Sequence, residues 1–332
     1  MSKSRLNGSE ATRTIVITGA LGHIGSRLIQ ALPRQFPDAK FVLLDNLSTQ
    51  RYPSLFSLPS SVDFSFVNAD IVSCSLERVL AGANTVIHLA AITDATSSFD
   101  NKDEMDQVNY RGTERLAQAC VATGTSLIYP SSTSVYGTEK DWVNEDCGPE
   151  DLQPQSPYAE SKLREEELLQ RLGKDEGLKY VTFRLGTIFG ISPGMRFHTA
   201  VNKFCWQAVM GEPLTVWKTA YNQSRPYLDL DDAVRAIAFL LERNQFTGEL
   251  YNVLSANATV GEIVDIIRSV IPSLEVTLVE AKIMNKLSYE VSDEKFRAIG
   301  FKPIGDLKRS INDTINLLRG ANSSFSSLLK DG

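Results

Sequence analysis

Short apolar runs alternate with longer amphipathic segments through the first 190 residues of the chain. The runs have the length and β-branched content of buried strands, and the segments between them have the composition of helices. Alternation of this kind builds βαβ units, whose strands lie parallel, so we predict an α/β fold with a doubly wound parallel sheet. The predicted strands are Thr14–Thr18, Lys40–Leu44, Val62–Val67, Thr85–Leu89, Ser126–Pro130 and Tyr180–Leu185, and helices are predicted to begin at Ser26–Leu32 and to span Asp103–Thr123 and Tyr158–Leu172.

The pattern loosens after Gly190, where helical segments are separated by Gly, Pro and Asn. We predict a smaller C-terminal α/β lobe over residues 191–320, beside a domain over 14–190 to which about 225–253 returns. The polar residues 1–13 and the Ser-rich residues 321–332 are expected to be irregular tails. The predicted helices of the lobe region are Val201–Met210, Asp231–Glu242 and Val260–Val270.

Charge and composition exclude several classes of function. The 332 residues carry a net charge of -6, from 34 basic and 40 acidic residues, without a run of Lys and Arg. A nucleic-acid partner is not expected, because binding a phosphate backbone needs clustered cations. The N-terminal residues contain no apolar stretch typical of a signal peptide or membrane anchor, so we expect a cytoplasmic protein with no membrane partner.

Cysteine and histidine are too sparse for a metal site or a disulfide framework. No Cys-x-x-Cys pair occurs, and we expect no bound metal and reduced thiols. The residues concerned are Cys74, Cys120, Cys147, Cys205, His23, His88 and His198.

Three glycines, Gly19, Gly22 and Gly25, lie between the first predicted strand and the following helix. Glycines in such a turn let the backbone approach a pyrophosphate, which the N-terminus of the helix then attracts. An ordinary tight turn is the alternative. Asp45 follows Gly25 by 20 residues at the end of the second predicted strand, where a carboxylate accepts the ribose hydroxyls of NAD and repels the extra phosphate of NADP. We therefore predict an NAD site, and Arg51 is the one nearby cation that would favour NADP.

Tyr158 and Lys162 stand four residues apart and share one face of a predicted helix. Such a pair also occurs by chance on solvated helices. Here the hydroxyl-rich segment Ser131–Gly137 follows a predicted strand upstream, where a hydroxyl can face the same cleft. A free tyrosine has a pKa of about 10 and becomes a base near neutral pH only when a cation lowers that value. The combination predicts proton transfer from a hydroxyl coupled to hydride transfer.

These motifs together resemble the extended short-chain dehydrogenase/reductases, in particular the NAD-dependent epimerase/dehydratase family with its UDP-glucose 4-epimerases. The similarity extends over nearly the whole chain and implies a Rossmann-type domain and a substrate-binding lobe. The segments that carry it are Thr18–Gly25, Asp45, Asp70–Ile71, His88–Ala91, Asn109–Thr113, Ser131–Gly137 and Pro157–Lys162.

The resemblance also implies roles for individual residues. Ser132, Tyr158, Lys162 and Asn109 are expected to be catalytic, and Thr133 is the alternative to Ser132 as the hydroxyl partner. Capping of a strand-end turn would explain both hydroxyls equally well. The residues expected to contact NAD are Gly19, Gly22, His23, Ile24, Gly25, Asp45, Asn46, Asp70, Ile71, Leu89, Ala90, Ala91, Tyr158 and Lys162.

The substrate side resembles a nucleotide-sugar site. Arg225 stands where the family's arginine grips the nucleotide diphosphate, and a guanidinium suits that task because its fork donates two parallel hydrogen bonds. A surface arginine before a helix cap is the alternative. Asn202 and Thr133 are further expected contacts. Thr187 replaces a common Asn and Asn285–Ser288 replaces an Arg-rich segment, so the base of the nucleotide stays open.

A nucleotide-sugar 4-epimerase with a transient 4-keto intermediate is the leading hypothesis for the function. The alternatives are an NAD(P)-dependent nucleotide-sugar 4-dehydrogenase or ketoreductase and a non-catalytic NAD-sensing protein. Dehydration and decarboxylation are disfavoured, because Ser132–Ser134 lacks the acidic residues that those relatives carry. A 3,5-epimerase/reductase would need His198 and Cys205 as an acid-base pair. The resemblance also implies a homodimer through the helices at Asp103–Thr123 and Tyr158–Leu172, with Cys120, Leu163 and Leu168 as candidate contacts.

Overall fold

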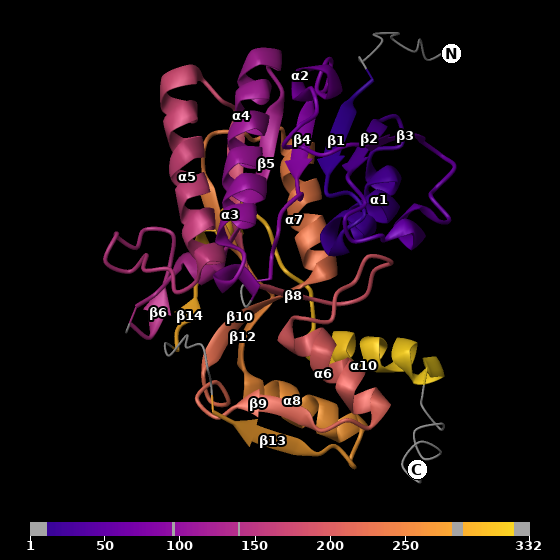
Figure 1. Cartoon of the computed structure of the whole chain (residues 1–332), viewed down its shortest axis with the longest axis vertical. Coiled ribbons are helices and arrows are strands. Elements are labelled where there is room, and N and C mark those ends of the chain that lie inside the picture. The colour runs from indigo at the N-terminus through magenta and orange to yellow at the C-terminus, as the bar shows by residue number, and fades with distance from the viewer. Residues whose placement is uncertain (1–11, 95–96, 139, 281–287, 322–332) are drawn as a thin grey trace, which may run out of the picture.

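The computed structural model describes residues 12–94, 97–138, 140–280 and 288–321. A seven-stranded parallel sheet forms the centre of the larger, upper part in Figure 1, in the order β11-β7-β5-β4-β1-β2-β3. The predicted doubly wound parallel sheet is therefore confirmed. Its strands are β1 (Thr14–Thr18), β2 (Lys40–Asp45), β3 (Asp63–Asn68), β4 (Thr85–His88), β5 (Ser126–Ser132), β7 (Tyr180–Leu185) and β11 (Leu250–Val253).

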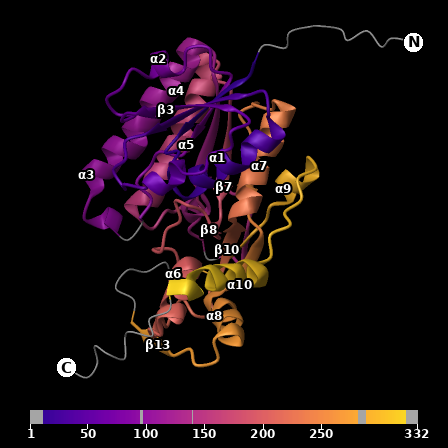
Figure 2. The same ribbon diagram turned by 90° about the vertical axis from the view of Figure 1, so that its right-hand side faces the viewer.

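Both faces of this sheet are covered by helices, because successive side chains of a strand point to opposite faces. Ile15 and Ile17 of β1 pack with α1 and α7, whereas Val16 between them packs with α2, α4 and α5. Figure 2 shows α1 and α7 on one side of the strands and α4 on the other. The helices are α1 (His23–Gln35), α2 (Leu76–Val79), α3 (Lys102–Met105), α4 (Gly112–Thr123), α5 (Pro157–Glu176) and α7 (Leu230–Arg243).

Two helices differ from their predicted form. Helix α1 begins at His23, ahead of the predicted Ser26, because the extended Gly22 acts as its N-cap. The segment predicted as one helix over 103–123 contains a π-helical stretch, η3 (Asp106–Arg111), between α3 and α4. Hydrophobic periodicity does not reveal such an insertion, and π-bulges are frequent at functional sites.

The smaller, lower part has a core of its own, formed around α6, α8 and α10. A three-stranded sheet of order β12-β10-β8 connects this part to the larger one, and β9 pairs with β13 beneath it. The elements are β8 (Thr187–Phe189), α6 (Ala200–Met210), β9 (Leu214–Trp217), β10 (Ser224–Asp229), β12 (Ala256–Thr259), α8 (Val260–Val270), β13 (Val276–Val279) and α10 (Leu307–Leu318).

The chain passes between the two parts more than once. After β10 it enters α7 and β11 of the larger part, and Phe296 of α9 later packs in the same core. Where the two lobes divide stays a prediction. The remaining elements are η1 (Tyr52–Leu55), η2 (Ser97–Phe99), η4 (Thr133–Val135), β6 (Trp142–Val143), β14 (Glu290–Val291), α9 (Glu294–Ala298) and η5 (Arg319–Ala321).

The ends of the chain are described only in part. Arg13 donates to Leu241 O and lies over the ring of Phe36, so this residue of the expected N-terminal tail is anchored. The rest of both expected tails, apart from Thr12 and Ala321, falls outside the described residues. No helix in the described ranges is long and apolar enough to cross a membrane.

Candidate active site

The glycine turn between β1 and α1 lies against the end of β4. Gly19 has a φ of 62°, and a Cβ there would lie 2.6 Å from the backbone nitrogen of Ala90. A Cβ on Gly25 would lie 2.6 Å from Ala20 O. Side chains are therefore excluded at both positions. The turn lies at the carboxyl edge of the sheet, beside the strand from which the order runs outward in both directions, where open α/β sheets bind ligands.

The N-terminus of α1 has the character of an anion site. The backbone N–H groups of His23 and Ile24 have no acceptor among the described residues, and no acidic side chain occupies the first turn. His23 donates from Nε2 to Gly190 O over 2.9 Å, and burial lowers its pKa to about 4. The imidazole is therefore neutral near pH 7, and the positive end of the helix dipole remains for a diphosphate.

Two carboxylates line the same edge of the sheet beyond β2 and β3. Asp45 accepts from the backbone of Leu21 at 3.0 Å and of Leu47 at 2.9 Å. Asn46 donates to Asp70 at 2.9 Å, which joins the ends of the two strands. The buried Ile71 follows Asp70 directly. These residues, expected to surround an adenosine, lie together along one border.

The end of β4 supplies the opposite border. Leu89 donates its backbone N–H to Thr18 O, and Ala90 donates to Thr18 Oγ1 over 3.2 Å. Asn109, fully buried in the π-helical stretch, accepts from Ile92 N and donates to Ile92 O, each over 2.8 Å. Its amide therefore fixes the loop that follows Ala91. Among the residues that the structure describes, no hydrogen bond joins Asn109 to the other predicted catalytic residues.

Helix α5 carries the tyrosine and lysine pair in its first two turns. Ser156 caps the helix through Ala159 N, and Pro157 occupies the first position. Tyr158 is partly exposed, and its hydroxyl has no hydrogen-bond partner among the described residues. Lys162 is buried and donates from Nζ to Tyr129 Oη at 3.0 Å and to Glu165 Oε2 at 3.3 Å.

Glu165 was missed by sequence reasoning. Its fully buried carboxylate accepts from Thr113, Tyr129 and Ser161 as well as from Lys162. The network continues to His88, which bonds Thr113 at 3.1 Å and Thr18 at 2.8 Å, and burial lowers the His88 pKa to about 3. A continuous set of polar contacts therefore links Lys162 to the glycine turn. Glu165 looks like one of several solvated acids in sequence, because its partners on other elements are 36 and 52 residues away.

The two candidate hydroxyl partners are arranged differently. Ser132 ends β5 and is partly exposed, and its Oγ accepts from the N–H of Ser134 at 3.2 Å and its hydroxyl at 2.8 Å. Because Ser132 Oγ only accepts in these bonds, its own proton is free to donate. Thr133 is buried and donates to Leu185 O at 3.2 Å. The geometry favours Ser132 over Thr133 as a donor to a substrate oxygen.

The predicted substrate contacts lie in two environments. Arg225 is on β10 and donates to Ser224 O at 2.8 Å and Gln223 Oε1 at 3.2 Å. Thr187, partly exposed, opposes Tyr227 across the strands β8 and β10. Asn202 is fully buried; its amide accepts from Gly190 N at 3.2 Å and donates to Arg196 O at 3.0 Å. Both ends of that amide thus hold a loop.

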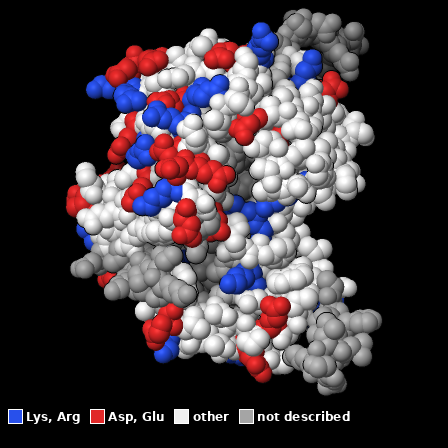
Figure 3. All heavy atoms as spheres, viewed as in Figure 1, with Lys and Arg blue, Asp and Glu red and all other residues white. Residues whose placement is uncertain are grey.

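This loop, residues 190–196, lies on the glycine turn. Ser192 donates to His23 O and Gly194 N donates to Ser26 Oγ, both over 2.9 Å. A Cβ on Gly194 would lie 2.3 Å from Leu21 O, so glycine is required for the contact. Arg196 donates to Thr93 Oγ1 across the cleft. Figure 3 shows Lys and Arg atoms in the hollow between the two parts of the molecule, which suits an anionic ligand.

Comparison with known proteins decides the family. A model of the NAD dependent epimerase/dehydratase family matches residues 15–253. The chain belongs to this family. The match includes the glycine turn, Ser132, Tyr158, Lys162 and Arg225. The family resemblance inferred from the motifs is thereby confirmed.

Several members of the NAD-dependent epimerase/dehydratase family resemble the chain over most of its length. The trifunctional UDP-glucose 4,6-dehydratase/UDP-4-keto-6-deoxy-D-glucose 3,5-epimerase/UDP-4-keto-L-rhamnose-reductase of Arabidopsis thaliana is 31% identical over 303 residues, 87% of this chain and 44% of that protein. Human dTDP-D-glucose 4,6-dehydratase is 26% identical over 95% of this chain and 92% of its own. The UDP-glucuronic acid 4-epimerase of Bacillus cereus, with UDP-glucuronic acid and NAD, has a TM-score of 0.81 at 27% identity, over 92% of this chain and 99% of that one. This chain spans less than half the length of the Arabidopsis relatives.

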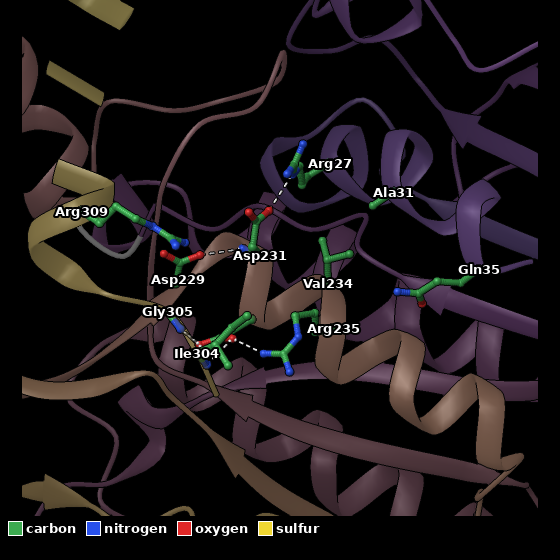
Figure 4. Close-up of a pocket in the computed structure, with 11 residues that line it drawn as sticks. Arg27, Ala31, Gln35, Asp229, Asp231, Val234, Arg235, Ile304, Gly305 and Arg309 are labelled. Atoms are coloured by element: carbon green, nitrogen blue, oxygen red, sulfur yellow. Dashed lines mark hydrogen bonds and ion pairs between the residues drawn. The ribbon is translucent and has the colours of Figure 1, made fainter. Parts of the chain in front are cut away.

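A further pocket lies outside this family site. Figure 4 shows a pocket between α1, α7 and the segment before α10, where Arg27 pairs with Asp231 at 2.6 Å and Arg235 with Asp232 at 2.7 Å. Asp232 also accepts hydrogen bonds from Ile304 N and Gly305 N, and these bonds attach the segment before α10 to α7. In the ranges that the structure describes, no group of His, Cys, Asp and Glu could hold a metal ion.

Proposed function

We propose that this protein is a nucleotide-sugar 4-epimerase that retains NAD through its catalytic cycle. The observation that carries the proposal is the arrangement at one edge of the sheet. The glycine turn follows β1, Asp45 ends β2 and Ser132 ends β5, all at the carboxyl edge of the sheet. Tyr158 carries a hydroxyl that has no hydrogen-bond partner among the described residues. Residues 132–134 contain no carboxylate that would support elimination of water.

The coenzyme would be held by residues of both borders. The site fits the pyrophosphate of NAD in two respects. The backbone N–H groups of His23 and Ile24 have no acceptor among the described residues, and the turn lacks Cβ atoms at Gly19, Gly22 and Gly25. We assign the ribose to Asp45, with Asn46, Asp70 and Ile71 beside the adenine. Leu89, Ala90 and Ala91 would line the other side, and Lys162 would contact the nicotinamide ribose. Bound NAD supplies the acceptor and donor of a hydride.

The proton would move through Tyr158. Its hydroxyl oxygen takes the proton of the sugar's 4-hydroxyl while Ser132 donates a hydrogen bond to the same sugar oxygen. Lys162 lies four residues further along α5, on the same face of the helix. Asn109 keeps the loop after β4 in place. In the return step Tyr158 gives back the proton after the sugar has presented its other face.

The substrate would be a sugar linked to a nucleoside diphosphate. Support comes from the solved relative that carries UDP-glucuronic acid and NAD on the same fold. We assign the diphosphate to Arg225, with Thr187 on the neighbouring strand, and place Thr133 and the Asn202-braced loop around the sugar. Cys205 is fully buried in the apolar core of the smaller part, and burial raises its pKa to about 12. It is therefore a poor partner for His198 in 3,5-epimerisation.

Incubation of the purified protein with UDP-glucose, UDP-glucuronic acid, UDP-N-acetylglucosamine and dTDP-glucose tests the proposal, without added coenzyme. We expect a 4-epimer at equilibrium from at least one of them, with no net reduced nicotinamide. Tyr158→Phe is the matched negative control. Accumulated ketone with stoichiometric NADH would indicate a dehydrogenase, a need for added NADH a ketoreductase, and loss of water a dehydratase.

The proposal also includes a cytoplasmic homodimer formed through α4 and α5, which lie side by side. Cys120 and Leu168 do not form its surface, because both side chains pack inside the subunit with the sheet. Leu163 is partly exposed and stays a candidate contact. Sedimentation at micromolar concentration should show twice the 36.7 kDa of one chain. A single species at the monomer mass would contradict the dimer.

A further inference from the structure

Tyr289 lies between the two parts of the molecule, and its side chain reaches the hydroxyl loop of the larger one. It is 2% exposed. Its hydroxyl donates to Thr133 O at 3.3 Å and to Tyr136 O at 3.2 Å. Both carbonyls belong to the turn that directly follows Ser132, so one phenol spans the backbone of this turn.

The same ring carries the arginine assigned to the diphosphate. Arg225 Cζ lies 5.1 Å from the centroid of the Tyr289 ring, within the range of a cation–π contact. On its other side Tyr289 meets Tyr136 edge to face, with centroids 6.2 Å apart. Arg184 lies over Tyr136 at 4.8 Å and is itself paired with the buried Glu166. The four side chains form a column from the substrate lobe to the central sheet.

The backbone around Tyr289 is held firmly, so the ring has a defined position. Ser288 Oγ accepts from Ser224 N at 2.9 Å, next to Arg225 in the chain. Asn257 on β12 bonds both the N–H and the carbonyl of Val291, each over 3.0 Å. Residues 290 and 291 pair with β6. Movement of Arg225 relative to the turn after Ser132 is therefore resisted through Tyr289.

We propose that Tyr289 is a positioning residue that couples the grip of Arg225 on the nucleotide diphosphate to the placement of the Ser132 hydroxyl. The ring keeps the guanidinium flat and oriented toward the phosphates, and the hydroxyl holds the turn from Thr133 to Tyr136. Nucleotide binding then stabilises the turn from which Ser132 acts. The inference rests on the proposed function, because it uses the roles assigned there to Arg225 and Ser132.

Two substitutions separate the two halves of this coupling. Tyr289→Phe keeps the ring under Arg225 and removes the hydroxyl, so UDP affinity should stay within about twofold while kcat for epimerisation falls about tenfold. Tyr289→Leu removes the ring as well, and UDP affinity should then fall about tenfold in addition. Tyr251→Phe is the matched control, since Tyr251 lies in the core of the larger part and its hydroxyl has no described hydrogen bond. It should leave both quantities unchanged.

A measurement without turnover distinguishes this inference from the proposed function. In the NAD-loaded protein, UDP should slow amide hydrogen exchange across residues 133–137, and Tyr289→Phe should remove that protection although UDP still binds. This result would stand even if no epimer is formed. Wild-type exchange and wild-type kcat in Tyr289→Phe would overturn the inference. Loss of UDP binding in Tyr289→Phe, with native circular dichroism, would also overturn it, because the ring alone should support Arg225.

Discussion

Tyr158 and Lys162, neighbours on one helix, differ in their hydrogen bonding. The Tyr158 hydroxyl has no hydrogen-bond partner in the part of the chain that the structure describes, whereas the ammonium of Lys162 donates to Tyr129 and Glu165. A hydroxyl with no partner is free to meet a substrate. An ammonium that is hydrogen-bonded to two buried groups is held at a defined position.

Tyr158→Phe should abolish turnover and leave coenzyme binding intact. In the proposed mechanism the phenol transfers the proton but contributes little to affinity for NAD, so we expect kcat to fall by at least about a thousandfold. The dissociation constant for NAD, measured by calorimetry, should change less than about twofold. A variant that kept a tenth of wild-type turnover would show that another group is the base.

Glu165→Gln should destabilise the protein although it removes only one charge. The carboxylate is fully buried, so the variant leaves the Lys162 ammonium inside without a counterion, and the free energy of unfolding should fall by about 3 kcal/mol. Glu167→Gln on the same helix is the control, because Glu167 is exposed and should change the value by less than about 0.5 kcal/mol. Urea unfolding of both variants measures the difference. Equal stabilities would mean that Glu165 is not the counterion.

At the scale of elements, the site depends on one loop as much as on helices and strands. Residues 190–196 follow β8 and lie against the glycine turn ahead of α6, and the buried Asn202 amide holds both ends of this stretch. The loop also forms hydrogen bonds with α1. In the proposed epimerase, this segment would help to retain the coenzyme.

Gly194→Ala should loosen this closure. The new Cβ would lie 2.3 Å from Leu21 O and 2.5 Å from Gly22 O, both backbone atoms, so the loop must move away. We expect NAD affinity to fall about tenfold, as measured by fluorescence titration. Gly320→Ala is the control, because a Cβ there meets nothing within 4 Å. Unchanged affinity in Gly194→Ala would show that the loop is not needed to hold the coenzyme.

The stability of the whole molecule depends on two neutral, buried histidines. Burial lowers the pKa of His23 to about 4 and that of His88 to about 3, below the value of 6.5 in an unfolded chain. The unfolded state therefore binds protons first as the pH falls. The stabilisation is complete above pH 6.5 and is lost progressively as the pH falls toward the folded pKa values.

Acid should therefore weaken the fold already between pH 7 and pH 5, because the unfolded histidines take up protons in this range. Between pH 7 and pH 5 each histidine should lower the free energy of unfolding by about 2 kcal/mol. Urea unfolding at both pH values measures the sum, and His23→Gln should remove about half of the difference. His198→Gln should remove less of the difference, because its side chain is exposed to solvent although its pKa is also lowered to about 4. An acid dependence unchanged in His23→Gln would contradict the assignment.

Short stretches of the sequence were enough to predict much of the fold. The apolar runs that became β1, β2, β4 and β7 needed only alternation and length to be recognised, and the glycine turn with Asp45 needed only spacing. Such features depend on neighbours in the chain, because backbone conformation and strand burial are local properties. The sheet and the family were predicted correctly on this basis. The roles of the site residues remain predictions.

Contacts between distant parts of the chain were decided by the tertiary structure alone. Glu165 in the Lys162 network, Gly194 on the glycine turn and Tyr289 under Arg225 carry no periodic or spacing signal. From sequence alone, a buried carboxylate cannot be told from the other acids of its helix, and a glycine or tyrosine with a structural role cannot be told from others of its type. What distinguishes them is the desolvation and packing that arise only when distant segments of the chain fold against one another, since charge, ring and backbone interact over a few ångströms and not over residue number.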